Sequence, residues 1–387
     1  MGSTKVLKTI LDETSTLKYF IEYDGFFSNH MSHGLIALSK LGASETRLRR
    51  FIKVYEAKLE STTGPTNILA DDSFEELKGE RKSYYSILKH FEDLAKGRTI
   101  TELLNSEFPK VAKGMVCSAI HGLIHTGYAV AVQNTKLTCE GLAYLHHSFV
   151  PLIAADSRIR TLRRDAPTYD ILEAIGIVAK DDTLFELMKT EVAKPKYTDK
   201  VTSNFQRRVA ALFTVAADTL LDYIDKITLP PTFNPNIQTT QEAVGLGRWL
   251  LDCAITVYVK SENKNDFFLL HGVTGAWSLL QILPALTYND AIYSIRVFMC
   301  AFVATYLAQM RAPLTVDVNT TLKPTADDWD KLIEATVDEE RDEHIYKLVQ
   351  VCHGLALEDD VKHTQQSMYF QAANIAISNA LLFVKYD

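Results

Sequence analysis

The sequence predicts an all-α protein, built as one large domain of many helices. Apolar residues recur every three or four positions along most of the chain, which is the spacing of one helix face. Runs in which apolar and polar residues alternate between turn signals are scarce, so a sheet is not expected. No repeat of fixed period is present, which counts against a helical solenoid. The apolar stripes lie at 35–41, 48–55, 84–94, 170–178, 205–226, 243–258, 291–310, 326–357 and 366–384.

Glycine and proline mark where these segments end. Gly97 follows the 84–94 stripe, as expected for a helix C-terminus. A Pro-rich connection at 229–236 should be extended, and it is the place where the chain could be subdivided. Candidate metal ligands lie on both sides of it, which favours a single domain over 1–387. A second loop runs from 311 to 324, and Thr325 then begins a helix with acidic residues in its first turn.

Composition limits the classes of partner. The formal net charge is −7, which argues against a nucleic-acid-binding face. The five cysteines include no Cys-x-x-Cys pair, so a zinc ribbon is excluded and a reducing, cytoplasmic setting fits best. The N-terminus shows no apolar core of a signal peptide. The apolar stretches 115–132 and 267–286 are interrupted by polar or helix-breaking residues, so we expect core helices rather than membrane spans. The oligomeric state stays open.

Six of the eleven histidines form a pattern that suggests metal binding. His30 and His33 lie three residues apart and His121 and His125 four apart, so each pair can share one face of a helix. Neutral imidazole is a ligand for iron, zinc, copper and nickel. The other two histidines are His271, which opens His-Gly-Val-Thr-Gly, and His344, which precedes Lys347.

Each of these histidines also has a structural interpretation. His121, His125 and His271 lie in apolar segments, where a buried imidazole needs either a hydrogen-bond partner or a metal. His30 and His33 could instead be polar residues of a first helical turn. The chain has no Gly-x-Gly-x-x-Gly, no Walker loop, no Gly-x-Ser-x-Gly and no His-Glu-x-x-His, so no nucleotide or hydrolase motif competes with the metal hypothesis.

Five segments in the same order resemble the questin oxidase-like family. The first runs from Asn29 to Leu38 and continues through Leu41–Ser44 to Arg47-Leu48. The others are His121–Ala129, which matches His-x-x-x-His-x-Gly-Tyr-Ala, then His271–Thr274, Asp342–Leu348 and the Ala-rich stretch Tyr369–Ala380. Each segment is short, but together they span most of the chain.

The resemblance implies a helical non-haem iron oxygenase that opens a ring of anthraquinones or related aromatic polyketides. It implies an Fe(II) site between helices whose ligands are His33, His121, His125, His271 and a carboxylated Lys347, with His30 and His344 in reserve. Thr274 and His33 are the residues assigned to catalysis, and NADPH would act only as an external reductant. The substrate pocket is expected to be lined by Phe26, Phe27, Tyr128, Phe267 and Trp277.

Two other functions remain open at this point. The same histidines could hold zinc in a hydrolase, or they could be core hydrogen-bonding residues of a non-catalytic helical binding protein. For Lys347, helical periodicity and the family resemblance give different predictions. It projects away from the apolar stripe formed by Ile345, Leu348, Val349 and Cys352, so periodicity predicts an exposed side chain, and only the resemblance makes it a ligand.

Overall fold

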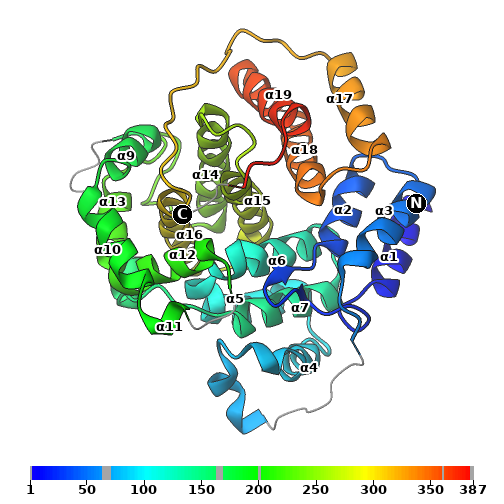
Figure 1. Cartoon of the computed structure of the whole chain (residues 1–387), viewed down its shortest axis with the longest axis horizontal. Helices are drawn as coiled ribbons and strands as arrows, with labels where there is room; N and C mark the ends of the chain where they lie inside the picture. The colour runs from blue at the N-terminus through cyan, green and yellow to red at the C-terminus, as the bar shows by residue number, and fades with distance from the viewer. Residues whose placement is uncertain (1, 63–70, 163–168, 199–201, 360, 384–387) are drawn as a thin grey trace. The chain divides into compact units, whose positions relative to one another are not determined.

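The chain is almost entirely helical (Figure 1). The computed structural model describes residues 2–62, 71–162, 169–198, 202–359 and 361–383. Within these ranges it contains nineteen α-helices and several 3-10 turns. The described strands are two-residue segments, β1 (Glu22–Tyr23) and β2 (Phe27–Ser28), which pair antiparallel. The all-α prediction is therefore confirmed.

The chain divides into two compact units. Unit 1 consists of Met1–Gly64, Ala254–Thr274 and Pro313–Val384, and unit 2 mainly of Pro65–Cys253 and Gly275–Ala312. The Pro-rich connection 229–236 lies inside unit 2, so the boundaries of the units fall elsewhere. The prediction of a single domain stays a prediction.

Unit 1 brings the two ends of the chain together. In Figure 1 the blue helix α2 lies beside the orange α18, and the red α19 packs along α18. The complete helices of this unit are α1 (Gly2–Glu13), α2 (Met31–Lys40), α3 (Glu45–Tyr55), α17 (Ala326–Asp338), α18 (Glu343–Ala356) and α19 (His363–Ser378). Two long helices, α14 (Thr240–Lys260) and α15 (Phe267–Ile282), contribute residues to both units.

Gly34 and Arg47 explain how α2 and α3 pack within unit 1. A Cβ at Gly34 of α2 would collide with the ring of Phe51 on α3, so glycine permits the close approach of these helices. Arg47 of α3 is buried, and its Nη2 donates to the Tyr346 hydroxyl (2.8 Å) and the Glu339 carbonyl (3.0 Å). One guanidinium with several donors therefore ties α3 to the segment that leads into α18.

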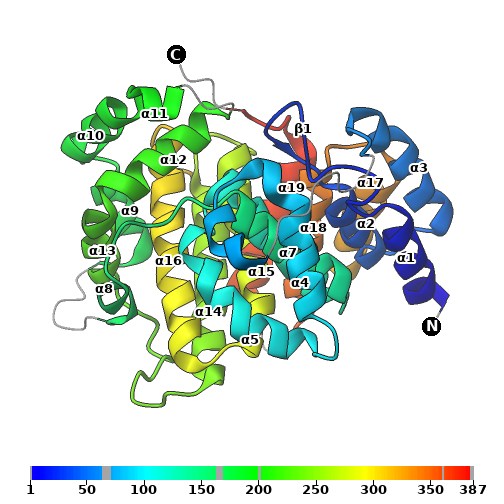
Figure 2. The ribbon, with the colours of Figure 1, turned by 90° about the horizontal axis from the view of Figure 1, so that it is seen from below.

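Unit 2 is built around α16 (Tyr288–Ala308), which is buried at every position from Ala291 to Ala308. In Figure 2 this yellow helix lies beside the green helices α12 and α13. The other helices of unit 2 are α4 (Tyr84–Leu94), α5 (Ile100–Val111), α6 (His121–Ala131), α7 (Thr135–His147), α8 (Asp156–Arg160), α9 (Ile171–Val178), α10 (Asp182–Val192), α11 (Pro195–Thr198), α12 (Asn204–Val215) and α13 (Ala217–Asp225).

Most predicted helices are observed, but two long stripes contain breaks. The 205–226 stripe forms α12 and α13, which meet at Ala216. The 326–357 stripe forms α17 and α18, separated by residues 339–342. The helix start at Thr325 is confirmed, since its side chain accepts from the Asp328 N–H and forms a capping box. The helix predicted at 366–384 ends early. Helix α19 stops at Ser378, and Leu382 forms an isolated β-bridge with Asp266.

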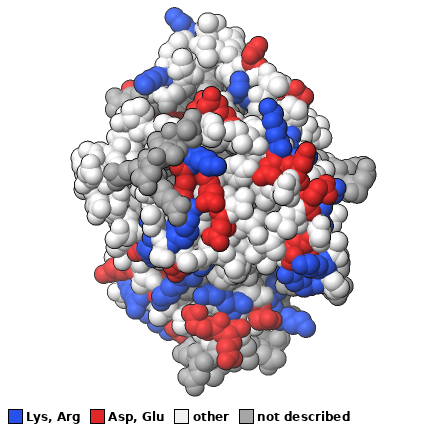
Figure 3. Space-filling view, turned by 90° about the vertical axis from the view of Figure 1, so that its left-hand side faces the viewer, with Lys and Arg blue, Asp and Glu red and all other residues white. Residues whose placement is uncertain are grey.

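The expected core helix 267–286 is observed as α15 and a short 3-10 turn, whereas the α-helix in the 115–132 stretch, α6, begins only at His121 because residues 118–120 are left-handed. Segments Phe267–Ala285 and Tyr288–Ala308 are long and apolar enough to cross a membrane, but 78% and 100% of their most apolar windows are buried inside the protein. Such burial is typical of core helices. All five cysteines are buried and free. Acidic side chains stand among basic ones over the face drawn in Figure 3.

Candidate metal centre

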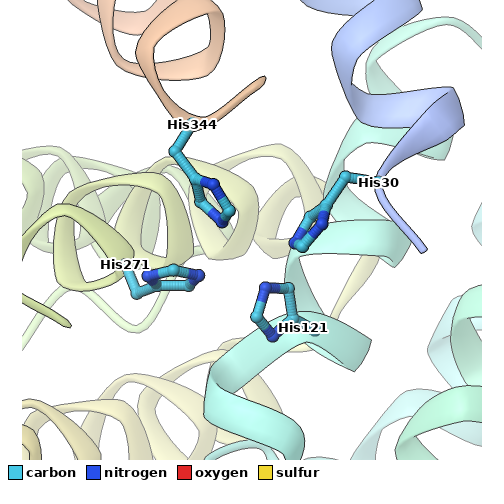
Figure 4. Close-up of side chains that lie close together, drawn as sticks. All are labelled: His30, His121, His271 and His344. Carbon is cyan, nitrogen blue, oxygen red and sulfur yellow. The ribbon is translucent and has the colours of Figure 1, made fainter. Parts of the chain in front are cut away.

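Three histidines from distant segments of unit 1 converge. His30 occupies the N-cap position of α2, His271 lies in the second turn of α15, and His344 lies in the first turn of α18. Each offers one ring nitrogen, and these nitrogens lie within 4.8 Å of one another. The ring centroids are 4.5 Å apart for His30 and His344 and 4.8 Å apart for His271 and His344. All three side chains are buried, and Figure 4 shows their rings turned toward one another.

Hydrogen bonds at Nδ1 orient two of these rings. His271 Nδ1 lies 2.6 Å from the Phe267 carbonyl, one turn earlier in α15. His344 Nδ1 lies 2.6 Å from Asp342 Oδ1. A carbonyl or carboxylate oxygen can only accept, so in both rings Nδ1 carries the proton. The lone pair is then on Nε2, which is the tautomer that binds a metal.

His30 is oriented by a tyrosine and a glutamate. Its Nδ1 lies 3.1 Å from Glu343 Oε1 and 3.3 Å from the Tyr55 hydroxyl. Tyr55 also accepts the backbone N–H of His30 at 2.9 Å, and its own hydroxyl is 3.5 Å from Glu343 Oε1. Tyr55 and Glu343 therefore fix both the backbone and the ring of His30.

Burial and neighbouring charges set the protonation of the site. Burial lowers the pKa of His271 well below its ordinary value, and the neighbouring His344 and Lys347 lower it further. Burial alone would raise the pKa of Asp342, but the interaction with His344 outweighs it and lowers that pKa below its usual range. Burial raises the pKa of Glu343, and the nearby Asp342 adds to this effect. The environment thus favours a neutral His271 and an ionised Asp342.

Lys347 lies one turn beyond His344 and is fully buried. Among the residues that the structure describes, its Nζ has no hydrogen-bond partner. Burial lowers the pKa of Lys347 from 10.5 to about 8, and Glu343 and Asp342 partly oppose this shift. The exposed side chain predicted from periodicity is wrong. The reason is that α2, α17 and α19 all pack on α18 and leave it no solvent face at this turn.

A comparison with family models identifies the relationship. The questin oxidase-like model matches residues 27–352, a range that includes every histidine of this centre. The chain belongs to the questin oxidase-like family. A search of curated proteins returns no match. Membership indicates an oxidoreductase that acts with O2 on a small molecule of the aromatic polyketide type.

Within this questin oxidase-like chain, the reserve histidines lie at the centre. His30 and His344 are the two that converge with His271. His33 is buried on α2, with its ring centroid 5.5 Å from that of His30. The buried Thr274 lies one turn after His271, and its hydroxyl donates to the Leu270 carbonyl at 3.3 Å. The assignment of His33 as a ligand and of His33 and Thr274 to catalysis stays a prediction.

Unit 2 holds the other predicted histidine pair on α6. His121 is the first residue of this helix, and its Nδ1 is hydrogen-bonded to the Ser118 carbonyl. His125, one turn later, places Nε2 3.4 Å from Glu140 Oε2 of α7, and both side chains are buried. The roles of His121 and His125 as ligands stay predictions.

The predicted pocket residues lie in three places. Phe267 contacts two histidines of the cluster, with ring centroids 4.3 Å from His271 and 4.8 Å from His344. Phe26 and Phe27 pack on each other in the hairpin (4.5 Å), and Phe27 is 46% exposed. Tyr128 and Trp277 pack together inside unit 2 at 4.7 Å. Phe267 is therefore the aromatic residue of the set that the structure places against the histidines of unit 1.

The residues that orient the rings were not predicted from the sequence. Asp342 and Glu343 stand directly before His344, so the acidic dipeptide next to a candidate ligand was an available signal. Tyr55 ends a helix 25 residues after His30 in the chain, and no spacing rule relates the two. Only the packing of α3 against α2 and α18 brings the Tyr55 hydroxyl to His30.

Proposed function

We propose that this protein is an iron(II)-dependent oxygenase that opens a ring of an anthraquinone-like substrate by oxidative carbon–carbon cleavage. One observation carries the proposal, namely the convergence of His30, His271 and His344 with Nδ1 of each ring held by an oxygen partner. Such partners are typical around histidine ligands, since they fix the tautomer and the direction of Nε2. A core histidine that only fills space does not require three such arrangements at one point.

The donor set suits iron. Neutral imidazoles with carboxylate or other oxygen donors are typical of non-haem Fe(II) oxygenases. We propose His30, His271 and His344 as ligands. His33, His121 and His125 are the further ligands that the family resemblance supplies, and the metal content of single His→Ala variants distinguishes them. When bound, iron(II) would supply the electron transfer that lets O2 react with the substrate.

Lys347 is proposed as an anionic oxygen ligand after carboxylation. Its neutral amine would add CO2 to give a carbamate, forming one N–C bond and releasing one proton. With a pKa of about 8, roughly one lysine in five is neutral at pH 7.4. The buried Nζ has no hydrogen-bond partner in the described part of the chain, so the added carboxylate does not displace an existing contact.

The protein itself would orient the substrate and exclude water. Phe267 offers an aromatic face beside His271 and His344, against which a planar ring system can pack. Burial of all three histidines keeps bulk water away from the reacting atoms. If both oxygen atoms enter the product, O2 balances the reaction. If only one enters, the other becomes water, and a reductant such as NADPH must supply two electrons.

Product analysis under labelled oxygen tests the proposal. Fe(II)-loaded protein is incubated with a panel of hydroxylated anthraquinones under 18O2, and products are analysed by mass spectrometry. We expect a ring-opened product that carries one or two 18O atoms, and we expect no such product from His271→Ala. His363→Ala, at an exposed histidine of α19, is the matched control and should retain activity. Products without 18O, or equal activity in His271→Ala, would contradict the proposal.

A further inference from the structure

A strained turn precedes His121. Ser118, Ala119 and Ile120 have φ angles of 48°, 53° and 71°, so three successive non-glycine residues adopt the left-handed conformation. Non-glycine residues visit this region singly as a rule, and a β-branched residue such as Ile120 is especially disfavoured there. All three are buried. Glycine occurs nearby at 114 and 122 but not within the turn.

The surrounding structure of unit 2 holds this turn in place. Val150 N–H donates to Cys117 Sγ at 2.7 Å, and Arg81 Nη2 donates to Ser118 Oγ at 3.3 Å. A Cβ at Gly275 would lie 2.8 Å from Ile120 Cγ2, so the Ile120 side chain is closely packed. A strained conformation that its surroundings enforce in this way is characteristic of functional sites.

The left-handed turn provides a backbone carbonyl that can accept a hydrogen bond from a histidine at the start of a helix. His271 lies inside α15, so the carbonyl four residues earlier is available to its Nδ1. His121 is the first residue of α6 and has no preceding turn of the same helix. The left-handed turn instead directs the carbonyl of Ser118, three residues earlier, to His121 Nδ1.

We propose that the left-handed turn Ser118–Ile120 is a positioning element for His121. It fixes the ring with the proton on Nδ1 and thus presents Nε2 as the ligand atom. The inference rests on the metal-binding role proposed for His121, although the tautomer itself is independent of any metal. The stored strain then serves to hold one imidazole in a single state at the point where a helix begins.

Ala119→Pro tests the inference, because proline fixes φ at about −65° and so cannot adopt the left-handed conformation of the turn. The matched control is Gln133→Pro, at an exposed left-handed residue (φ 52°) beyond the other end of α6. Both variants should lower Tm by a few degrees. If Ala119→Pro does not fold, Ala119→Val takes its place, because a β-branched residue is also disfavoured at positive φ. The tautomer of His121 is read from 15N shifts of histidine-labelled protein, with His121→Ala to assign the signals. Affinity for Co²⁺ is measured by competition with a chelator.

We expect Ala119→Pro to give a mixture of His121 tautomers and to weaken Co²⁺ binding about 10-fold or more, whereas Gln133→Pro should match wild type in both respects. An unchanged tautomer and an affinity within about twofold of wild type would overturn the inference. If wild-type protein binds no Co²⁺, the proposed metal centre fails. The tautomer comparison then decides the positioning role alone: loss of the Nδ1–H tautomer in Ala119→Pro supports the role, and an unchanged tautomer overturns it.

Discussion

At the scale of single residues, Lys347 is buried at a cost in free energy. Its pKa of about 8 lies well below the ordinary value of 10.5, chiefly because the folded protein removes the ammonium group from water. The native state therefore binds fewer protons than the unfolded state between pH 8 and 10.5. Stability should rise with pH through this window, and below it the full cost of the buried charge is present.

Replacement of Lys347 should consequently stabilise the protein when no metal or CO2 is present. We expect Lys347→Met to increase the free energy of unfolding by about 2–3 kcal/mol at pH 7, as measured by urea unfolding. The gain should shrink at pH 9.5. Lys331→Met, at a lysine that is 71% exposed, should change little at either pH. A less stable Lys347→Met protein, or a gain that does not depend on pH, would show that the buried amine is not destabilising.

The proposed carbamate makes a separate prediction at the same residue. Metal affinity of wild-type protein should fall about tenfold or more in CO2-free buffer and recover when bicarbonate is added, because an anionic ligand is lost and regained. Lys347→Met should bind metal weakly in both buffers. Affinity that is equal with and without bicarbonate in wild-type protein would exclude a carbamate ligand.

At the scale of elements, Asp266 determines how α15 begins. Its Oδ1 accepts the N–H groups of Phe268 (2.9 Å) and Leu269 (3.0 Å), so it caps the helix that carries His271. Burial nevertheless raises its pKa from 3.8 to about 6, and the two backbone bonds only reduce this shift. The native state thus holds this proton more tightly than the unfolded state. Stability therefore falls as pH rises from about 4 to 6.

Asp266→Asn keeps an oxygen for the cap and removes the charge. We expect its stability relative to wild type to be about 1 kcal/mol more favourable at pH 7.5 than at pH 5. Chemical unfolding at the two pH values measures this difference. Asp93→Asn is the control, since that exposed carboxylate is paired with Lys89 and Lys96 and should give no such gain. A relative stability that is the same at both pH values would mean that the Asp266 carboxylate is not destabilised.

The helices themselves could mostly be predicted, because an amphipathic stripe follows from burial on one face. The breaks at Ala216 and at residues 339–342 could not, since apolar spacing continues across them. The helix α18 shows the limit of periodicity more clearly. Its neighbours cover several faces at once, so polar residues such as Lys347 are buried although they lie off the apolar stripe.

At the scale of the whole molecule, the sequence indicated six candidate histidines but not how they are arranged. The family motifs contain His30, His271 and His344, yet the choice between His30 and His33 depends on the start of α2 and on Tyr55 from α3. Such contacts between distant segments have no local sequence signal. The centre in unit 1 is made by chain segments about 240 and 310 residues apart that only the complete fold of that unit brings together.

Metal analysis shows whether these histidines hold a metal ion. Protein without a histidine tag is purified without added metal, in parallel with His271→Ala, His121→Ala and the exposed control His363→Ala. We expect near-stoichiometric iron in wild type and His363→Ala and its loss in His271→Ala. Loss in His121→Ala would support the role proposed for His121 as a ligand. Zinc in place of iron, or a folded wild-type protein that stays free of metal after addition of Fe(II), would contradict the proposed iron centre.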